Sequence, residues 1–132
     1  MKAMDIDSIM ELISMNNSKE AQSCGIELAR KIECFNVFFQ PNNPHYNKNV
    51  WDNCALIISE KTDDELVPYL SKMFEWLMDL NWPGAEIIMD RIRKLNKSPM
   101  FYLVWNNCKK CAIALEDEIW LRNLEEIFID SN

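Results

Sequence analysis

The chain has 132 residues, of which 48% are hydrophobic and 27% charged, a composition typical of a folded globular protein and unlike that of a disordered one. Its 14 basic and 21 acidic side chains give a formal net charge of −7, which disfavours nucleic acid and favours a cationic partner. No apolar run approaches the roughly 20 residues that cross a bilayer, and the first residues lack the apolar segment of a secretory signal.

These bounds predict one domain, residues 1–132, with no membrane association and a cytoplasmic location. The 5 cysteines are an odd number, so they do not indicate a framework of paired disulfides. The 2 glycines and 5 prolines leave little material for β-turns, and alternation of apolar and polar residues is nowhere sustained. The expected fold class is therefore all-α.

The first predicted helix covers about residues 5–14, and Ser18 is placed to cap a second helix that runs to about residue 32. The aromatic segment 34–39 leads into residues 40–47, whose two prolines and three asparagines predict an irregular loop. A third helix is expected at about residues 49–60.

Thr62 and Glu65 have the spacing of a capping box and predict the start of a fourth helix. Pro68 lies in or just beyond its first turn, where a slight kink is expected and not a break. A fifth helix is expected at about residues 83–95. Ser98 and Pro99 begin a sixth that runs to about residue 115, and a seventh follows the acidic residues 116–118, which suit a helix N-terminus. The seventh helix is expected to bury Ile119, Leu124, Ile127 and Phe128.

The stretch 79–85 joins two of these helices with almost no loop. Asn81 suits a cap of the junction, and Pro83 suits the first turn of the new helix. We expect Asn81 to hydrogen-bond the backbone and Trp82 to be mostly buried. Together with Asp79, they form a structural motif that closes an αα-hairpin, and about seven helices in such hairpins resemble the stacked pairs of HEAT-type repeats.

Residues 75–85, Glu-Trp-Leu-Met-Asp-Leu-Asn-Trp-Pro-Gly-Ala, are similar to the Trp-Leu-x-Asp-x-Asn-Trp-Pro signature of a bacterial HEAT-like family, domain of unknown function 5071. Residues 50–55 and 62–66 resemble the same family pattern, so the resemblance is best over residues 48–95. It implies a small helical fold. It implies no activity.

The residues do not form a catalytic, cofactor-binding or metal-binding set. Cys108 and Cys111 are the one pair with metal-like or redox-like spacing, but a zinc site needs further ligands, and the single histidine, His45, lies in the irregular loop. Buried helical cysteines, on the inward face with Val104, Ala112 and Leu115, are the favoured interpretation, with a redox role as the alternative. With 2 glycines, far apart, no Gly-rich phosphate loop can form.

A protein-binding surface is expected in the last two helices. Carboxylates gather there, and tryptophan dominates binding hot spots in protein interfaces. The acidic residues also suit helix capping and a solvated face. The candidate residues are Trp105, Glu116, Asp117, Glu118, Trp120, Glu125 and Glu126.

The favoured hypothesis is a non-catalytic module that binds a basic protein, in one form an immunity or antitoxin-like protein that masks a cationic toxin. One alternative is a helical-repeat protein or enzyme that acts on nucleic acid, which would need a basic groove. A passive subunit of a larger assembly is the other. Neither cofactor nor metal is expected.

Overall fold

The computed structural model describes residues 5–129, and the fold of that part is helical throughout, with no strand. This confirms the all-α fold class. The chain divides into two compact units, residues 1–60 and 61–132, which are described separately. That the two behave as one domain, and that the hairpins stack in the HEAT manner, both stay predictions.

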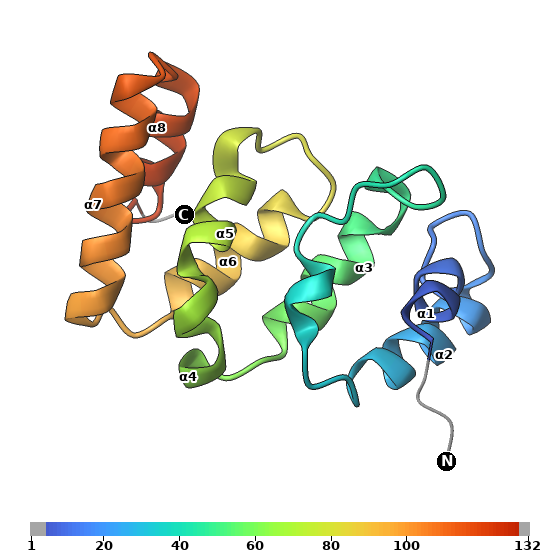
Figure 1. Cartoon of the computed structure of the whole chain (residues 1–132). Coiled ribbons are helices and arrows are strands. Elements are labelled where there is room, and N and C mark those ends of the chain that lie inside the picture. Colours follow the sequence, from blue (N-terminus) through green and yellow to red (C-terminus); the bar gives the residue numbers. More distant parts are fainter. Residues whose placement is uncertain (1–4, 130–132) are drawn as a thin grey trace. The chain divides into compact units, whose positions relative to one another are not determined.

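The described residues contain seven helices if the interrupted run from Asp63 to Met78 is counted as one (Figure 1). Unit 1 holds α1 (Ile6–Leu12), α2 (Lys19–Ala29), the 3₁₀ turn η1 (Phe35–Phe38) and α3 (Lys48–Ser59). Unit 2 holds α4 (Asp63–Leu66), η2 (Val67–Tyr69), α5 (Leu70–Glu75), η3 (Trp76–Met78), α6 (Ala85–Lys94), α7 (Pro99–Ala114) and α8 (Glu118–Glu126).

The three expected N-caps are confirmed. The side chains of Ser18, Thr62 and Ser98 each accept a hydrogen bond from a backbone N–H in the first turn of their helix. Thr62 and Glu65 complete the reciprocal capping box. Pro68 lies in the 3₁₀ turn η2 between α4 and α5, so it interrupts the α-helical hydrogen bonding without ending the helical run.

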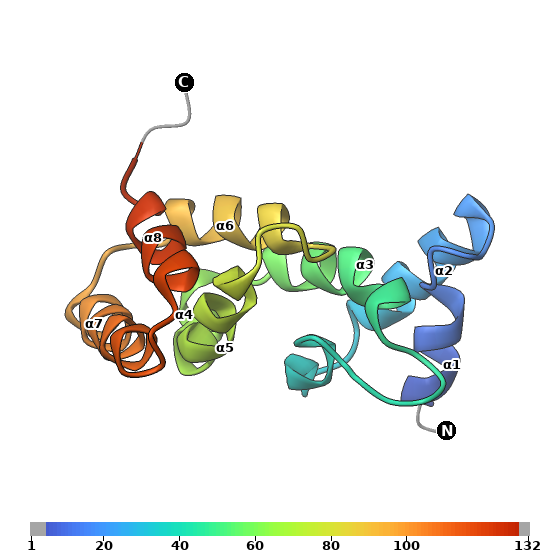
Figure 2. The ribbon, with the colours of Figure 1, turned by 90° about the horizontal axis from the view of Figure 1, so that it is seen from above.

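Unit 1 is held together by a close helix contact and a buried amide. Gly25 of α2 lies against the end of α1, where an added Cβ would be 2.6 Å from Cγ2 of Ile13. From α3, the buried Asn53 donates its Nδ2–H to the carbonyl of Ile13 at 2.8 Å and to Oε1 of Gln22 at 2.9 Å. Figure 2 shows the same three helices from above. The amide satisfies carbonyl groups that α1 leaves unpaired at its C-terminal end.

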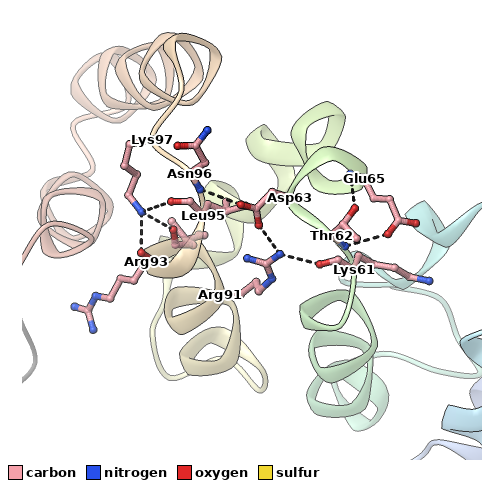
Figure 3. Close-up of polar contacts among 10 residues, drawn as sticks. Lys61, Thr62, Asp63, Glu65, Arg91, Arg93, Leu95, Asn96 and Lys97 are labelled. Atoms are coloured by element: carbon pink, nitrogen blue, oxygen red, sulfur yellow. Dashed lines mark hydrogen bonds and ion pairs between the residues drawn. The ribbon is translucent and has the colours of Figure 1, made fainter.

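Unit 2 is tied across α4 and α6 by one arginine (Figure 3). Arg91 donates to the carbonyl of Lys61 at 2.8 Å and to Oδ1 of Asp63 at 2.7 Å, and its side chain is only 13% exposed. Oδ2 of Asp63 accepts from the backbone N–H of Asn96 at 3.1 Å. The Arg91 guanidinium therefore holds the pKa of the Asp63 carboxyl below its usual range.

The C-terminal end of α6 is capped by a lysine. The Lys97 ammonium donates to the carbonyls of Ile92, Arg93 and Leu95 at 3.1, 2.8 and 2.8 Å (Figure 3). The last carbonyls of a helix lack the usual α-helical partners, although that of Ile92 also accepts from the N–H of Leu95 at 3.0 Å. A cation at this end also opposes the negative end of the helix dipole. Burial lowers the pKa of this ammonium.

Two buried tryptophans pack in the core of unit 2 and hydrogen-bond its backbone. Trp76 is fully buried and donates its indole N–H to the carbonyl of Pro83 at 3.0 Å. Trp120 of α8 is 2% exposed and donates to the carbonyl of Phe74 at 2.9 Å, and Asn123 donates to the carbonyl of Leu77 at 2.7 Å. Both indoles thus combine a large apolar contact with a satisfied polar atom.

The junction at residues 79–85 differs in detail from the expectation. The capping side chain is Asp79, whose Oδ1 accepts from the backbone N–H of Asn81 at 2.8 Å, while Asn81 itself is exposed. The helix begins at Ala85, two residues after Pro83, and its N-cap is Gly84 at a φ of 84°. Only glycine adopts that conformation without steric cost. Trp82 is half-buried.

Candidate protein-binding surface

The expected surface lies on the hairpin of α7 and α8, which pack side by side (Figure 1). Its turn is a Schellman motif: the N–H of Asp117 donates to the carbonyl of Ala112 at 2.8 Å, and that of Glu116 to the carbonyl of Ile113 at 3.0 Å. Asp117 then caps α8 by accepting from the N–H of Trp120 at 2.9 Å. The turn therefore fixes the backbone of three consecutive acidic residues, and the carboxylate of Asp117 is held by its capping bond.

Glu116 occupies the left-handed position of this turn, with a φ of 56°. Glycine is the usual residue there, because a Cβ crowds the following carbonyl at positive φ. The chain instead carries an exposed carboxylate at this position.

Apolar side chains surround the acidic turn and are open to solvent. Ile113, Leu115 and Ile119 are 61%, 66% and 60% exposed. Two shallow hollows lie beside them, one of about 490 Å³ and one of about 420 Å³. Residues 116–118 line both hollows; Ala112, Ile113 and Leu121 complete the first, and Leu115 and Ile119 the second.

A second exposed group gathers toward the other end of the same hairpin. The rings of Tyr102 and Phe128 are stacked at 6.0 Å between centroids, and Trp105 meets Phe128 edge to face at 4.9 Å. Tyr102 and Phe128 are exposed, whereas Trp105 is half-buried and donates its indole N–H to the carbonyl of Leu124 at 2.9 Å. The Lys109 ammonium lies 4.4 Å from the centroid of the Trp105 ring.

The structure brings only some of the expected residues together. The three acids 116–118 form one group. Glu125 and Glu126 lie at the other end of α8, about 12 Å along a helix that rises 1.5 Å per residue. Glu125 is exposed, and Glu126 lines a separate hollow with Arg93, Arg122 and residues of α6. Trp120 belongs to the core and offers no accessible ring.

Several residues expected to be buried are in fact exposed: Ile119 on α8 and Phe128 just after it, and Cys111 on α7 and Leu115 just after it. The buried row of α8 is Trp120, Asn123, Leu124 and Ile127. At 3.6 residues per turn, Ile119 and Phe128 lie about 100° to either side of that row. A full count of helical angles would have placed both at the edge of the core.

Cys108 and Cys111, both on α7, also differ in exposure. Cys108 is buried and Cys111 exposed, and burial raises the pKa of the Cys108 thiol to about 11, so it stays protonated at neutral pH. The described residues contain no group of three or more His, Cys, Asp or Glu side chains arranged to hold a metal ion. No described helix is long and apolar enough to cross a membrane.

Unit 1 has one polar cleft of about 520 Å³, between α1 and the loop that precedes α3. His45 and Tyr46 line it, and the Tyr46 hydroxyl donates to Oδ1 of Asp7 at 2.8 Å. Glu11, Ser14 and Asn49 also line the cleft, and the Asn49 amide donates to the Ser14 hydroxyl at 3.0 Å. These bonds fasten the loop to α1, which is a structural role for Tyr46.

The family model described as Domain of unknown function (DUF5071) matches residues 47–129. The chain belongs to this family. No curated protein and no solved structure matches it. The DUF5071 match includes α3, the junction at residues 79–85 and the whole α7–α8 hairpin. It therefore covers the candidate surface as well as the signature residues.

Proposed function

We propose that this DUF5071 protein is a non-catalytic binding module whose α7–α8 turn docks a basic protein. An immunity or antitoxin-like protein that masks a cationic toxin is one specific form of this function. The observation that carries the proposal is the combination at the turn: three apolar side chains at least 60% exposed, set around three carboxylates. Apolar contact would supply affinity, and the carboxylates would select a cationic partner.

The conformation of Glu116 supports the same function. A non-glycine residue at positive φ costs stability, and such outliers cluster at functional sites. The fold does not need glutamate at this position, because glycine would form the same turn and the Glu116 side chain is exposed. A contact between the Glu116 carboxylate and a basic partner would explain why the chain carries glutamate here and not glycine.

The nucleic-acid alternative is less well supported. Two cations of unit 2, Arg91 and Lys97, are committed to backbone carbonyls and to Asp63. Lys109 lies over the ring of Trp105. A phosphate backbone needs free cations in a row, and the formal net charge of −7 opposes it.

The test is affinity capture from the native host with the whole chain as bait. The variant Glu116→Gln/Glu118→Gln removes two charges of the turn and leaves the capping Asp117 intact. Glu20→Gln/Glu33→Gln removes two exposed charges from unit 1 and is the matched control. We expect the partner to be basic and to dissociate as NaCl rises from about 0.05 M to about 0.5 M, because screening shortens the reach of exposed charges.

The turn variant should lose that partner and the control should keep it. Capture of nucleic acid, or of a protein whose binding ignores both salt and the turn variant, would contradict the proposal.

A further inference from the structure

The exposed side chains of the α7–α8 hairpin form two rows along one seam. Tyr102, Trp105, Lys109 and Ile113 follow one another at steps of three or four residues, which places them on one face of α7. Leu121 and Glu125 of α8, with Phe128 two residues beyond its end, make the corresponding row. Ring contacts between Trp105 and Phe128 join the rows at one end, and the hollow shared by Ile113 and Leu121 joins them at the other.

The two rows have the apolar composition of a surface that packs against another helix, but their side chains are open to solvent. A helical layer that faces solvent normally carries polar side chains on its outer face. Here Tyr102, Ile113 and Phe128 are between 41% and 61% exposed along the seam. Because the backbone N–H groups of both helices are engaged in helical hydrogen bonds, the seam offers no edge for an added strand. Recognition must therefore go through side chains.

From this geometry we infer that the basic partner contributes an amphipathic α-helix that lies along the α7–α8 seam. The inference rests on the proposed function and deepens it by naming the recognised element. Apolar residues of that helix, spaced three or four apart, would fill the positions over Ile113, Leu121 and the rings of Tyr102 and Phe128. The seam follows α7, which at 16 residues is about 24 Å long, enough for four helical turns.

Charge fixes the direction of the bound helix. Glu116, Asp117 and Glu118 make one end of the seam anionic. Lys109 stands in its middle, and toward the other end the two rows carry a single carboxylate, Glu125, against three at the turn. The N-terminus of a helix carries a partial positive charge. The partner helix therefore places its N-terminus and its basic side chains at the turn, antiparallel to α7, with no basic residue beside Lys109.

The test is selection of displayed helical peptides on the immobilised whole chain. The library consists of Ala-rich peptides about as long as α7, randomised for apolar, basic and acidic residues. We expect enriched peptides to carry an apolar row at helical spacing and to gather Lys and Arg in the first two turns. Moving those basic residues to the last two turns of the same peptide should weaken binding about tenfold.

Two matched pairs of variants locate the bound peptide. Ile113→Ser lies in the seam and Leu103→Ser outside it, and both side chains are more than half exposed. Ile113→Ser should weaken the selected peptides about tenfold and Leu103→Ser should leave them unchanged. Glu118→Gln should weaken N-terminally basic peptides, and Glu20→Gln should not.

The inference is overturned by a selection that yields no binder, by peptides without helical spacing, or by basic residues enriched at the C-terminal end. A native partner that needs the acidic turn but presents an extended segment would overturn the inference alone and leave the proposed function standing. A native partner whose binding is unchanged by Glu116→Gln/Glu118→Gln would contradict both the inference and the proposed function.

Discussion

Replacing Glu116 by glycine should stabilise the protein and weaken its binding at the same time. The left-handed conformation at a φ of 56° costs an L-residue about 1–2 kcal/mol relative to the right-handed one. Glycine removes that cost but loses about 0.5–1 kcal/mol more conformational entropy on folding. The difference is a net gain of about 0.5–1 kcal/mol in the free energy of unfolding.

Alanine at the same position separates the conformation from the carboxylate. Glu116→Ala keeps the Cβ and so keeps the strain, and the exposed carboxylate makes no hydrogen bond within the protein whose loss would matter. We therefore expect Ala to leave the free energy of unfolding within about 0.5 kcal/mol of the parent. Both variants lack the charge, so both should bind the basic partner more weakly and to a similar extent.

Urea unfolding followed by far-ultraviolet circular dichroism measures the first effect, and titration calorimetry with the captured partner measures the second. The same order of stabilities should appear in thermal unfolding, with the Gly variant melting highest. If Gly and Ala have equal stability, the positive φ is not a source of strain and the conformational argument fails. If Gly binds as well as the parent while Ala does not, the turn geometry matters and the carboxylate does not.

Three further outcomes test the structural roles. Trp120→Ala should lower the free energy of unfolding in urea by about 3–5 kcal/mol, as expected for a buried tryptophan. An unchanged midpoint would show that Trp120 is not buried. Asp79→Ala should cost about 1 kcal/mol through loss of its cap-like bond, whereas Asn81→Ala should change stability by less than about 0.5 kcal/mol. The depressed pKa of Asp63 gives stability that is present above about pH 4 and lost as the pH falls through the folded pKa. Asp63→Asn should therefore lose less unfolding free energy than the parent as the pH falls below about 4. If the variant loses as much as the parent, other carboxyls cause the acid destabilisation.

The helices and their caps could be read from the sequence because the signals are local. Ser18, Thr62 and Ser98 stand at helix starts that their own side chains satisfy, and each needs only the next three residues to do so. The 3₁₀ interruption at Pro68 follows from its missing N–H in the same way. Such signals hold whatever the rest of the chain does.

The side chains that cap the hairpin junction could not be assigned so well. Asp79 and Asn81 are both common in turns, and either side chain can bond the backbone two residues away. The choice depends on where Gly84 turns the chain, since its φ of 84° delays the helix to Ala85. Trp76 donates its indole N–H to the carbonyl of Pro83, directly before Gly84, and local spacing does not reveal this bond.

Burial on the last two helices was the least predictable property. Ile119 and Phe128 are apolar, and periodicity alone places them beside the core. Whether an edge position is covered depends on how many neighbours pack against the helix. α7 and α8 contact each other, α5 and η3, and these neighbours cover one side of the hairpin only. For Trp120, helical spacing favours burial, while its acidic sequence neighbours make it a candidate for a partly exposed anchor. The hydrogen bond to the Phe74 carbonyl, which is distant in the sequence, decides for burial.

The contacts around the hairpin junction at residues 79–85 show where function should be sought. Trp76 bonds the carbonyl of Pro83, Asp79 bonds the N–H of Asn81, and Gly84 supplies the positive φ that starts α6. These contacts all lie within the hairpin, so the residues that make them have a structural role. A binding role requires side chains that the fold leaves unsatisfied and exposed, and in unit 2 these lie on the α7–α8 hairpin. Proteins of the same fold can therefore bind different partners if the residues corresponding to 113–119 differ, because changing them leaves the junction at 79–85 intact.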